Sequence, residues 1–215
     1  MPERVGLPRG RAALPESEVS ASQRGRILDA VTREVAERGY AATTVAHVTA
    51  RARVSRSAFY EHFEDKADAF AQAHLQASQQ LLDLVRHRVA AKSGAPWRER
   101  LWVGVDAYLA GFERAPEYGT SFLVELHAAG PLVRQQRDRF IEAHALHLQR
   151  LAQRAEAEDS HVRRPTRLVA IGAVGGADEL SSRAIRATTR GEAPDLSRLR
   201  SPIFMIYEAV LLRAD

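Results

Sequence analysis

One stretch, Thr43–Phe63, constrains the fold more than any other part of the chain. Residues of its first half recur with the spacing of one helix face, namely Val45, Val48, Thr49 and Ala52. The pattern then breaks at Arg53 and resumes in a second short apolar run. Two short helices joined by a tight turn, a helix-turn-helix, fit this pattern. An ordinary helical hairpin fits it as well, so the stretch alone leaves both interpretations open.

Residues that cap helices stand at the expected ends of these short helices. Thr43 and Thr44 precede the first helix and Ser55 precedes the second. Each hydroxyl can accept a hydrogen bond from an unpaired N–H of the first turn. Gly39 is placed to end a preceding helix over 22–39, in the left-handed conformation that glycine favours. The amino-terminal part therefore predicts three helices.

Helical spacing continues through the rest of the chain, with glycine or proline at most of the breaks. Lys66 opens a long predicted helix, and further helices are predicted over 96–115, 118–129, 132–158, 166–190 and 199–213. No alternating apolar run and no hairpin turn sequence indicates a strand. We therefore predict an all-α chain with a flexible basic tail over 1–21, a three-helix domain over 22–66 and a second helical domain over 67–215.

The composition, 45% hydrophobic and 27% charged, is typical of a globular protein. No apolar run reaches the roughly 18 residues that cross a bilayer, and residues 1–20 lack a signal-peptide pattern, so we expect a cytoplasmic protein that makes no membrane contact. The absence of cysteine excludes disulfides and thiolate metal ligands. A net charge of +4 suits a polyanionic partner. In the tail, Arg4, Arg9 and Arg11 either contact such a partner or remain solvated.

Three segments together resemble the amino-terminal domain of TetR-family transcriptional regulators: Arg26–Ala30, Gly39–Val45 and Val54–Lys66. They stand in the family's order and at its spacing. The resemblance implies a homodimer that binds double-stranded DNA, with a second domain for ligand binding and dimerisation. It further implies a repressor that leaves a palindromic operator when a small-molecule effector binds. The likeness covers the first domain residue by residue and the second domain in architecture only.

By matching position, the resemblance implies DNA contacts for residues in and around the second short helix. Ser55, Arg56 and Ser57 stand at the start of this recognition helix, where side chains reach base edges in the major groove. Arg56 is the candidate for a bidentate contact with guanine. The residues whose positions hold phosphates in the family are Thr44, Tyr60, His62 and Lys66. Arg53 adds a further cation beside this helix.

Two positions depart from the family pattern. Arg53 stands where the family usually has glycine, and a left-handed turn would cost arginine on the order of 1 kcal/mol relative to glycine. Ala58 stands where the family usually has a threonine that bonds a phosphate. These departures keep a second hypothesis open, that of a small-molecule sensor whose DNA binding is weak or non-specific.

Aromatic and polar residues of the second domain predict either a ligand cavity or an ordinary core. The candidate ligand-binding residues are Trp102, Tyr108, Phe112, Phe122, Glu125, His127, Phe140 and His144. We expect no metal site, because His144 and His147 are three positions apart and the spacing supplies no third ligand. The sequence has no hydrolase, metalloprotease or nucleotide-binding motif, so we expect neither a cofactor nor enzyme activity.

The last two predicted helices resemble the family's dimer interface, where paired helices from two subunits form a four-helix bundle. The apolar residues of the final helix are Ile203, Phe204, Ile206, Tyr207, Val210 and Leu211. They either meet a second copy of the chain or close the core of the monomer.

Overall fold

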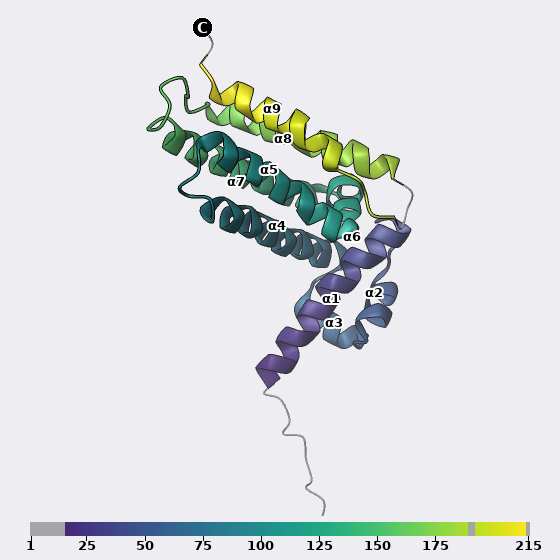
Figure 1. Ribbon diagram of the computed structural model, residues 1–215. Helices are drawn as coiled ribbons and strands as arrows, with labels where there is room; N and C mark the ends of the chain where they lie inside the picture. Colours follow the sequence, from purple (N-terminus) through teal and green to yellow (C-terminus); the bar gives the residue numbers. More distant parts are fainter. Residues whose placement is uncertain (1–15, 189–191, 214–215) are drawn as a thin grey trace, which may run out of the picture.

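The structure, a computed structural model, describes residues 16–188 and 192–213. An amino-terminal unit of three helices projects from a bundle of longer helices (Figure 1). The unit consists of α1 (Glu16–Arg38), α2 (Val45–Ala52) and α3 (Arg56–His62). From it α4 (Lys66–Ala90) runs along the bundle to its far end.

The bundle is completed by helices of very different length. In chain order they are α5 (Trp97–Arg114), α6 (Pro116–Gly119), the π-helical turn η1 (Thr120–Val124), the 3₁₀ turn η2 (Glu125–Ala128), α7 (Pro131–Ala155), α8 (Arg167–Ala187), the 3₁₀ turn η3 (Ser197–Leu199) and α9 (Arg200–Leu211). The helices α4, α5 and α7 pack on one another, and α8 and α9 lie side by side along one flank (Figure 1).

The all-α prediction is confirmed. Over residues 16–188 and 192–213, the only β-type pairing is a bridge between Val162 and Leu212. The first helix starts at Glu16 rather than at residue 22, so the end of the expected tail is helical; Arg4, Arg9 and Arg11 lie outside the described residues. In this part of the chain no helix has both the length and the apolar character needed to cross a membrane.

Capping residues stand at the boundaries of α1, α2 and α3 where the sequence predicts them. Gly39 follows α1 with a φ of +83°, the left-handed conformation that glycine allows. The Thr44 hydroxyl caps α2 by accepting from the N–H of His47 (3.2 Å), and the Ser55 hydroxyl caps α3 by accepting from the N–H of Ala58 (3.0 Å). Arg53, in the turn between α2 and α3, has a φ of +53° and a ψ of +49°. Arginine therefore does occupy a left-handed position.

The core of the amino-terminal unit is completed by the bundle. Ile27, Phe59 and Phe70 are fully buried in this core. The same cluster includes residues from beyond α5, namely Phe122, Leu126, Ala129 and Val133. Burying apolar surface is the main favourable term in folding, so the unit depends on the bundle for part of its stability.

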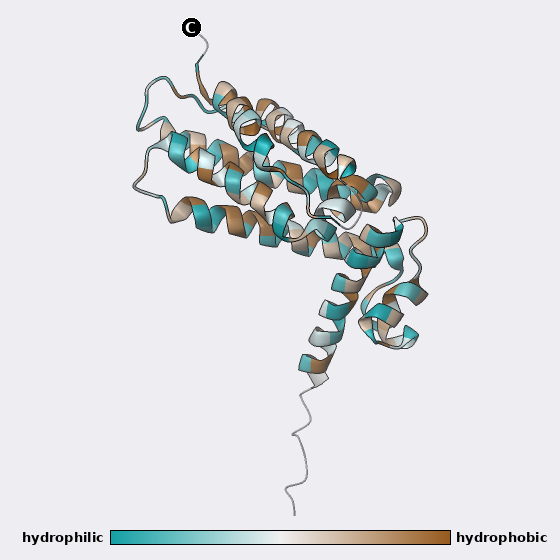
Figure 2. Cartoon of the chain, turned by 45° about the vertical axis from the view of Figure 1, so that its right-hand side comes forward, coloured by the Kyte–Doolittle hydropathy of each residue, from teal (hydrophilic) through white to brown (hydrophobic). Residues whose placement is uncertain are grey.

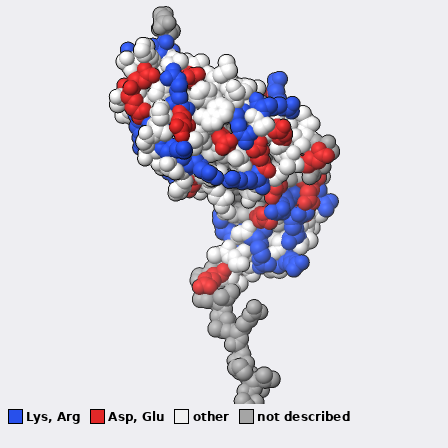
Figure 3. Space-filling model, viewed as in Figure 1, with Lys and Arg blue, Asp and Glu red and all other residues white. Residues whose placement is uncertain are grey.

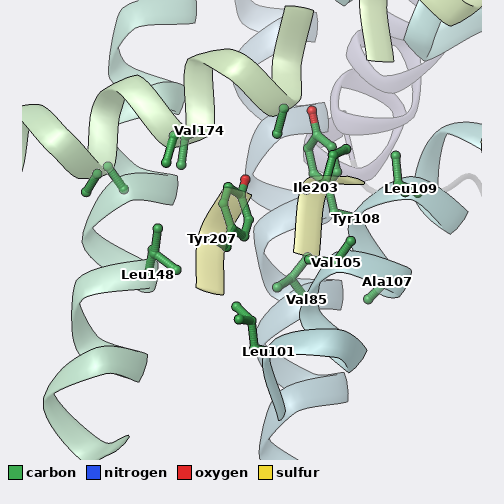
Figure 4. Packing of buried hydrophobic residues seen from close by; sticks show 14 of the residues in the cluster. Val85, Leu101, Val105, Ala107, Tyr108, Leu109, Leu148, Val174, Ile203 and Tyr207 are labelled. Carbon is green, nitrogen blue, oxygen red and sulfur yellow. The ribbon is translucent and has the colours of Figure 1, made fainter. Parts of the chain in front are cut away.

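Three of the apolar residues of α9 are buried in the core of the bundle. Each long helix carries both hydrophobic and hydrophilic residues, as expected of helices that are buried on one face (Figure 2). Ile203 and Tyr207 of α9 point towards Val105 of α5 and are buried (Figure 4). Leu211 is buried as well. These α9 residues close the monomer's own core, and the alternative that they meet a second copy is wrong for them.

Replacing Arg53 with glycine should stabilise the protein by about 0.5–1 kcal/mol, because relief of the left-handed strain exceeds the backbone entropy that glycine loses on folding. Urea unfolding of the variant and the wild type measures the difference. Arg139 is a control, because it is exposed to solvent and lies in the middle of α7. Replacing it with glycine should destabilise the protein by about 1 kcal/mol. Destabilisation of both variants would show that Arg53 is not strained.

Candidate nucleic-acid interface and ligand cavity

The turn between α2 and α3 is held from outside by Arg26. Its guanidinium, on α1, donates to the carbonyl oxygens of Ala52 (3.0 Å) and Arg53 (3.3 Å). These carbonyls end α2 and have no partner within that helix. Residue spacing does not predict this role of Arg26, because its acceptors lie at the end of a different helix and in the turn after it.

The recognition helix α3 is buried on one face and exposed on the other. Phe59 is buried in the core of the unit, and Ala58 beside it in the chain is buried as well, so its methyl group is not available on the exposed face. Arg56 and Ser57 are exposed, and Tyr60 is 47% exposed with its ring edge-on to Phe59. The Arg56 guanidinium lies 5.7 Å from the centre of the Tyr60 ring. These exposed side chains form the face that could meet a partner.

Several arginines of the amino-terminal unit are already paired. Arg38 and Arg51 each bind Glu34 at 2.6 Å, and Arg51 also pairs with Glu37. Burial acts to raise the pKa of Glu34, but the hydrogen bonds from Arg51 and Arg38 outweigh it and lower that pKa, so Glu34 is ionised at neutral pH. By contrast, Arg53 and Arg56 form no ion pair with any described residue. Lys and Arg side chains gather on the surface of this unit (Figure 3).

Lys66 has a structural role in addition to the predicted one. Its ammonium donates to the carbonyl oxygens of Tyr40 and Thr43, each at 2.7 Å, and lies 4.1 Å from the centre of the Tyr40 ring. Lys66 thus ties the start of α4 to the loop between α1 and α2. Two of its three N–H donors are used there, so a phosphate contact through the third stays a prediction.

The remaining predicted DNA contacts differ in exposure. The hydroxyls of Ser55 and Ser57 lie 2.9 Å apart on the exposed surface, and Thr44 is exposed at the start of α2. His62 is half-buried, and its Nε2 atom has no hydrogen-bond partner among the described residues. Only a movement of the His62 ring would bring this nitrogen to a phosphate.

A cavity of about 240 Å³, which we call the proximal cavity, lies in the bundle near the amino-terminal unit. Three of the predicted ligand-binding residues line it: Phe112, Phe122 and Phe140. Its other lining residues are His74, Ala77, Ser78, Gln80, Leu81, Leu84, Gly111, Ala115, Tyr118, Leu123, Arg137 and Asp178. Apolar walls with few polar groups are typical of small-molecule sites.

The other predicted ligand-binding residues do not line this cavity. Trp102 is 41% exposed and packs against Phe204 of α9, and His127 is exposed after η1. Tyr108 is buried in the core. Glu125 accepts a hydrogen bond from the backbone of the amino-terminal unit. His144 lines a second cavity. A helix face can turn to a core, to solvent or to a domain contact instead of to a cavity, and residue spacing alone does not distinguish these cases.

The polar groups of the proximal cavity come from residues that the sequence did not single out. Arg137 of α7 pairs with Asp178 of α8 at 2.6 Å. Burial raises the pKa of Asp178 despite the nearby Arg137, and its Oδ1 atom is buried with no partner among the described residues. Burial also lowers the pKa of His74 to about 4, so this imidazole is neutral at pH 7. The cavity therefore offers one unused hydrogen-bond acceptor, the Asp178 Oδ1 atom, next to the guanidinium of Arg137.

The segment Pro116–Ala128, which comprises α6, η1 and η2 and is here called the connecting segment, joins this cavity to the amino-terminal unit. Its Tyr118, Phe122 and Leu123 line the cavity. On its other side Ser121 donates to the carbonyl oxygen of Thr32 in α1 (2.7 Å), and Glu125 accepts from the N–H of Tyr40 (3.0 Å).

Metal binding finds no support in the side-chain arrangement. No group of three histidine, aspartate or glutamate side chains within residues 16–188 and 192–213 is placed to hold a metal ion.

Residues 27–73 match the family described as bacterial regulatory proteins, tetR family. No curated protein matches the sequence. Among solved structures, the fatty acid degradation regulator FadR from Bacillus halodurans is 17% identical, with a TM-score of 0.73 over 86% of this chain and 94% of FadR. FadR from Bacillus subtilis in complex with stearoyl-CoA is 17% identical, with a TM-score of 0.72 over 85% and 96% of the two chains.

A TetR-family transcription regulator from Marinobacter aquaeolei VT8 is 21% identical and has a TM-score of 0.66 over 92% of this chain and all of that one. At such identities these neighbours establish a shared fold, and the match over residues 27–73 identifies the helix-turn-helix domain. Residues 27–73 are thus a DNA-binding domain of the tetR family of bacterial regulatory proteins, in a chain that shares its overall fold with solved TetR-family regulators.

Proposed function

We propose that this protein is a homodimeric repressor that binds a palindromic operator and is released by a small molecule in the proximal cavity. The observation that carries the DNA-binding part is the exposed face of α3. There the Arg56 guanidinium lies over the Tyr60 ring, with exposed Ser57 next to it in the chain, and forms no ion pair with any described residue. Side chains at the start of such a helix reach base edges in the major groove, and phosphate contacts around them fix the register.

The homodimer is supported by an apolar surface on α8 and α9. Leu168 is 74% exposed, Met205 is 63% exposed and Val169 is 43% exposed. On α8, a Cβ atom added at Gly172, Gly175 or Gly176 would meet nothing within 4 Å, which leaves room for a second helix to approach closely. Exposed apolar residues gathered on one flank favour association with a partner of the same kind.

The effector part rests on the proximal cavity and the connecting segment. A ligand among Tyr118, Phe122 and Leu123 would press on the segment whose Ser121 and Glu125 hold the amino-terminal unit. α4 offers a second route, since His74 and Ser78 line the cavity and Lys66 binds the loop before α2. If the ligand prefers one orientation of the unit, it shifts the population towards that orientation. The structure of FadR from Bacillus subtilis is a complex with stearoyl-CoA, which supports an effector that has an apolar chain.

Arg56→Ala should weaken binding to a palindrome selected from random DNA by about 1–3 kcal/mol for each half-site, because a bidentate contact with guanine is lost. Binding to a scrambled duplex should change much less. Titration of labelled duplexes gives both affinities. Arg88→Ala, at an exposed position of α4 remote from α3, is the control for loss of one charge. Equal wild-type binding to the selected and the scrambled duplex would instead support a sensor with non-specific DNA binding.

Met205→Lys combined with Leu168→Lys should convert the dimer to a folded monomer, because two lysines would be buried without partners at the interface. Sedimentation velocity measures the change in mass, and operator affinity should fall with it. Leu132→Lys, at a 43% exposed position of α7, should leave the dimer intact. Dissociation by the control alone would place the interface elsewhere.

Ser121→Ala should lower operator affinity roughly two- to tenfold, because the hydrogen bond from Ser121 to the carbonyl oxygen of Thr32 helps to hold the amino-terminal unit in its orientation. This range corresponds to the net free energy of one hydrogen bond. Ser182→Ala is a matched control, since this hydroxyl donates to the carbonyl oxygen of Leu123 (2.9 Å) and does not touch α1. Both variants should lose similar thermal stability, and only the first should lose DNA affinity. An equal loss of affinity in both would rule out Ser121 as a coupling contact.

A further inference from the structure

A second cavity, of about 280 Å³, lies between α4, α5 and α7 and is here called the distal cavity. Its residues on α4 come from the last turns of that helix, Val85 to Ala90, so it lies at the end of the bundle farthest from α3 (Figure 1). None of its lining residues belongs to the proximal cavity. It is therefore separate from the site that the proposed effector function uses.

The inner wall of the distal cavity is apolar. Val85, Leu101, Val105 and Leu148 are buried and surround it, together with the ring of Tyr207 (Figure 4). Gly104 of α5 lines the cavity between Val85 and Val89. The hydroxyl of Tyr207 points away from Leu101, so it does not make this wall polar (Figure 4). Such a wall suits the apolar body of a ligand.

The rim of the distal cavity is cationic. Its charged lining residues are Arg86, Arg100, Arg150 and Arg154, and no aspartate or glutamate is among the described residues that line it. Arg86 pairs with Asp83, and Arg100 pairs with Glu158 at 2.6 Å. Arg150 and Arg154, one turn apart on α7, are exposed and form no ion pair with any described residue. The rim thus carries two positive charges that nothing described neutralises.

Histidines of α7 add to this environment. His147 lies close enough to Arg86 and Arg150 for both to lower its pKa, an effect added to that of burial. His144 is buried at the inner wall, and its Nδ1 atom has no hydrogen-bond partner among the described residues. A buried polar atom without a partner is costly unless a ligand or water satisfies it. Water can satisfy the His144 atom, whereas cations at the rim of a mainly apolar cavity are what an amphipathic anion would bind.

We propose that the distal cavity is a second ligand site, for a small organic monoanion whose apolar body lies among Leu101, Val105 and Leu148. The anionic group binds Arg150 and Arg154 at the rim, since charge-assisted hydrogen bonds to arginine favour carboxylates. The distance from α3 means that these arginines do not serve the DNA interface (Figure 1). The site can be occupied whether or not the protein is bound to DNA.

Isothermal titration calorimetry of the full chain with octanoate tests this assignment. Octanoate should bind, and octan-1-ol, which has the same chain without the charge, should bind much more weakly. Arg150→Gln combined with Arg154→Gln should weaken octanoate binding roughly tenfold or more, because two charge-assisted contacts are lost. Arg163→Gln combined with Arg164→Gln removes the same charge from exposed residues outside the cavity and should leave the affinity unchanged.

Two further variants distinguish the cavities. Gly104→Leu extends a side chain towards Val85 and Val89 and should abolish octanoate binding, with circular dichroism confirming that the helices persist. Ser78→Trp fills the proximal cavity and should leave octanoate binding intact. Loss of octanoate binding in Ser78→Trp but not in the Arg150 and Arg154 variant would overturn the proposal and leave the effector function of the proximal cavity standing. Absence of octanoate binding to the wild type would also overturn it.

Discussion

The structure depends on a core that the amino-terminal unit and the bundle form together. The helices α2 and α3 are short, and the buried residues Ile27 and Phe59 of the unit pack in the same cluster as Phe122 and Leu126 of the connecting segment. A small unit buries a smaller fraction of its surface than a large one, so sharing the core adds to its stability. The connecting segment consequently lies between the proximal cavity and the core on which the recognition helix packs. Under the proposed function, a change at the far side of that segment would reach α3 over a short path.

The parts of the fold that sequence predicts well are those decided within a few residues. Gly39, Thr44 and Ser55 could be placed at helix ends because each cap bonds an N–H or a carbonyl of its own helix end. The left-handed turn at Arg53 followed from comparison with a family pattern that has glycine there. The bonds made by Arg26 and Lys66 could not be predicted in this way, because their acceptors lie on other elements far along the chain.

The ligand cavities show the limit of helical periodicity. Periodicity identified Phe112 and Phe140 as members of an apolar face, and they do line the proximal cavity. The same rule could not tell that Trp102 faces α9, because it gives the direction of a side chain and not its neighbours. Arg137 and Asp178 look like ordinary charges of two amphipathic helices. Only the packing of α7 against α8 brings them together beside the cavity.

Gly39, the left-handed residue that follows α1, also restricts which substitutions this position can accept. A side chain at Gly39 would need a strained φ, and its Cβ would lie 3.2 Å from the Glu125 carboxylate that binds the N–H of Tyr40. Any replacement therefore disturbs a helix end and a contact between the two parts at once. Positions 39 and 125 should vary together or not at all among related chains. Such linked positions can trace the boundary between the two parts in sequences whose structures are unknown.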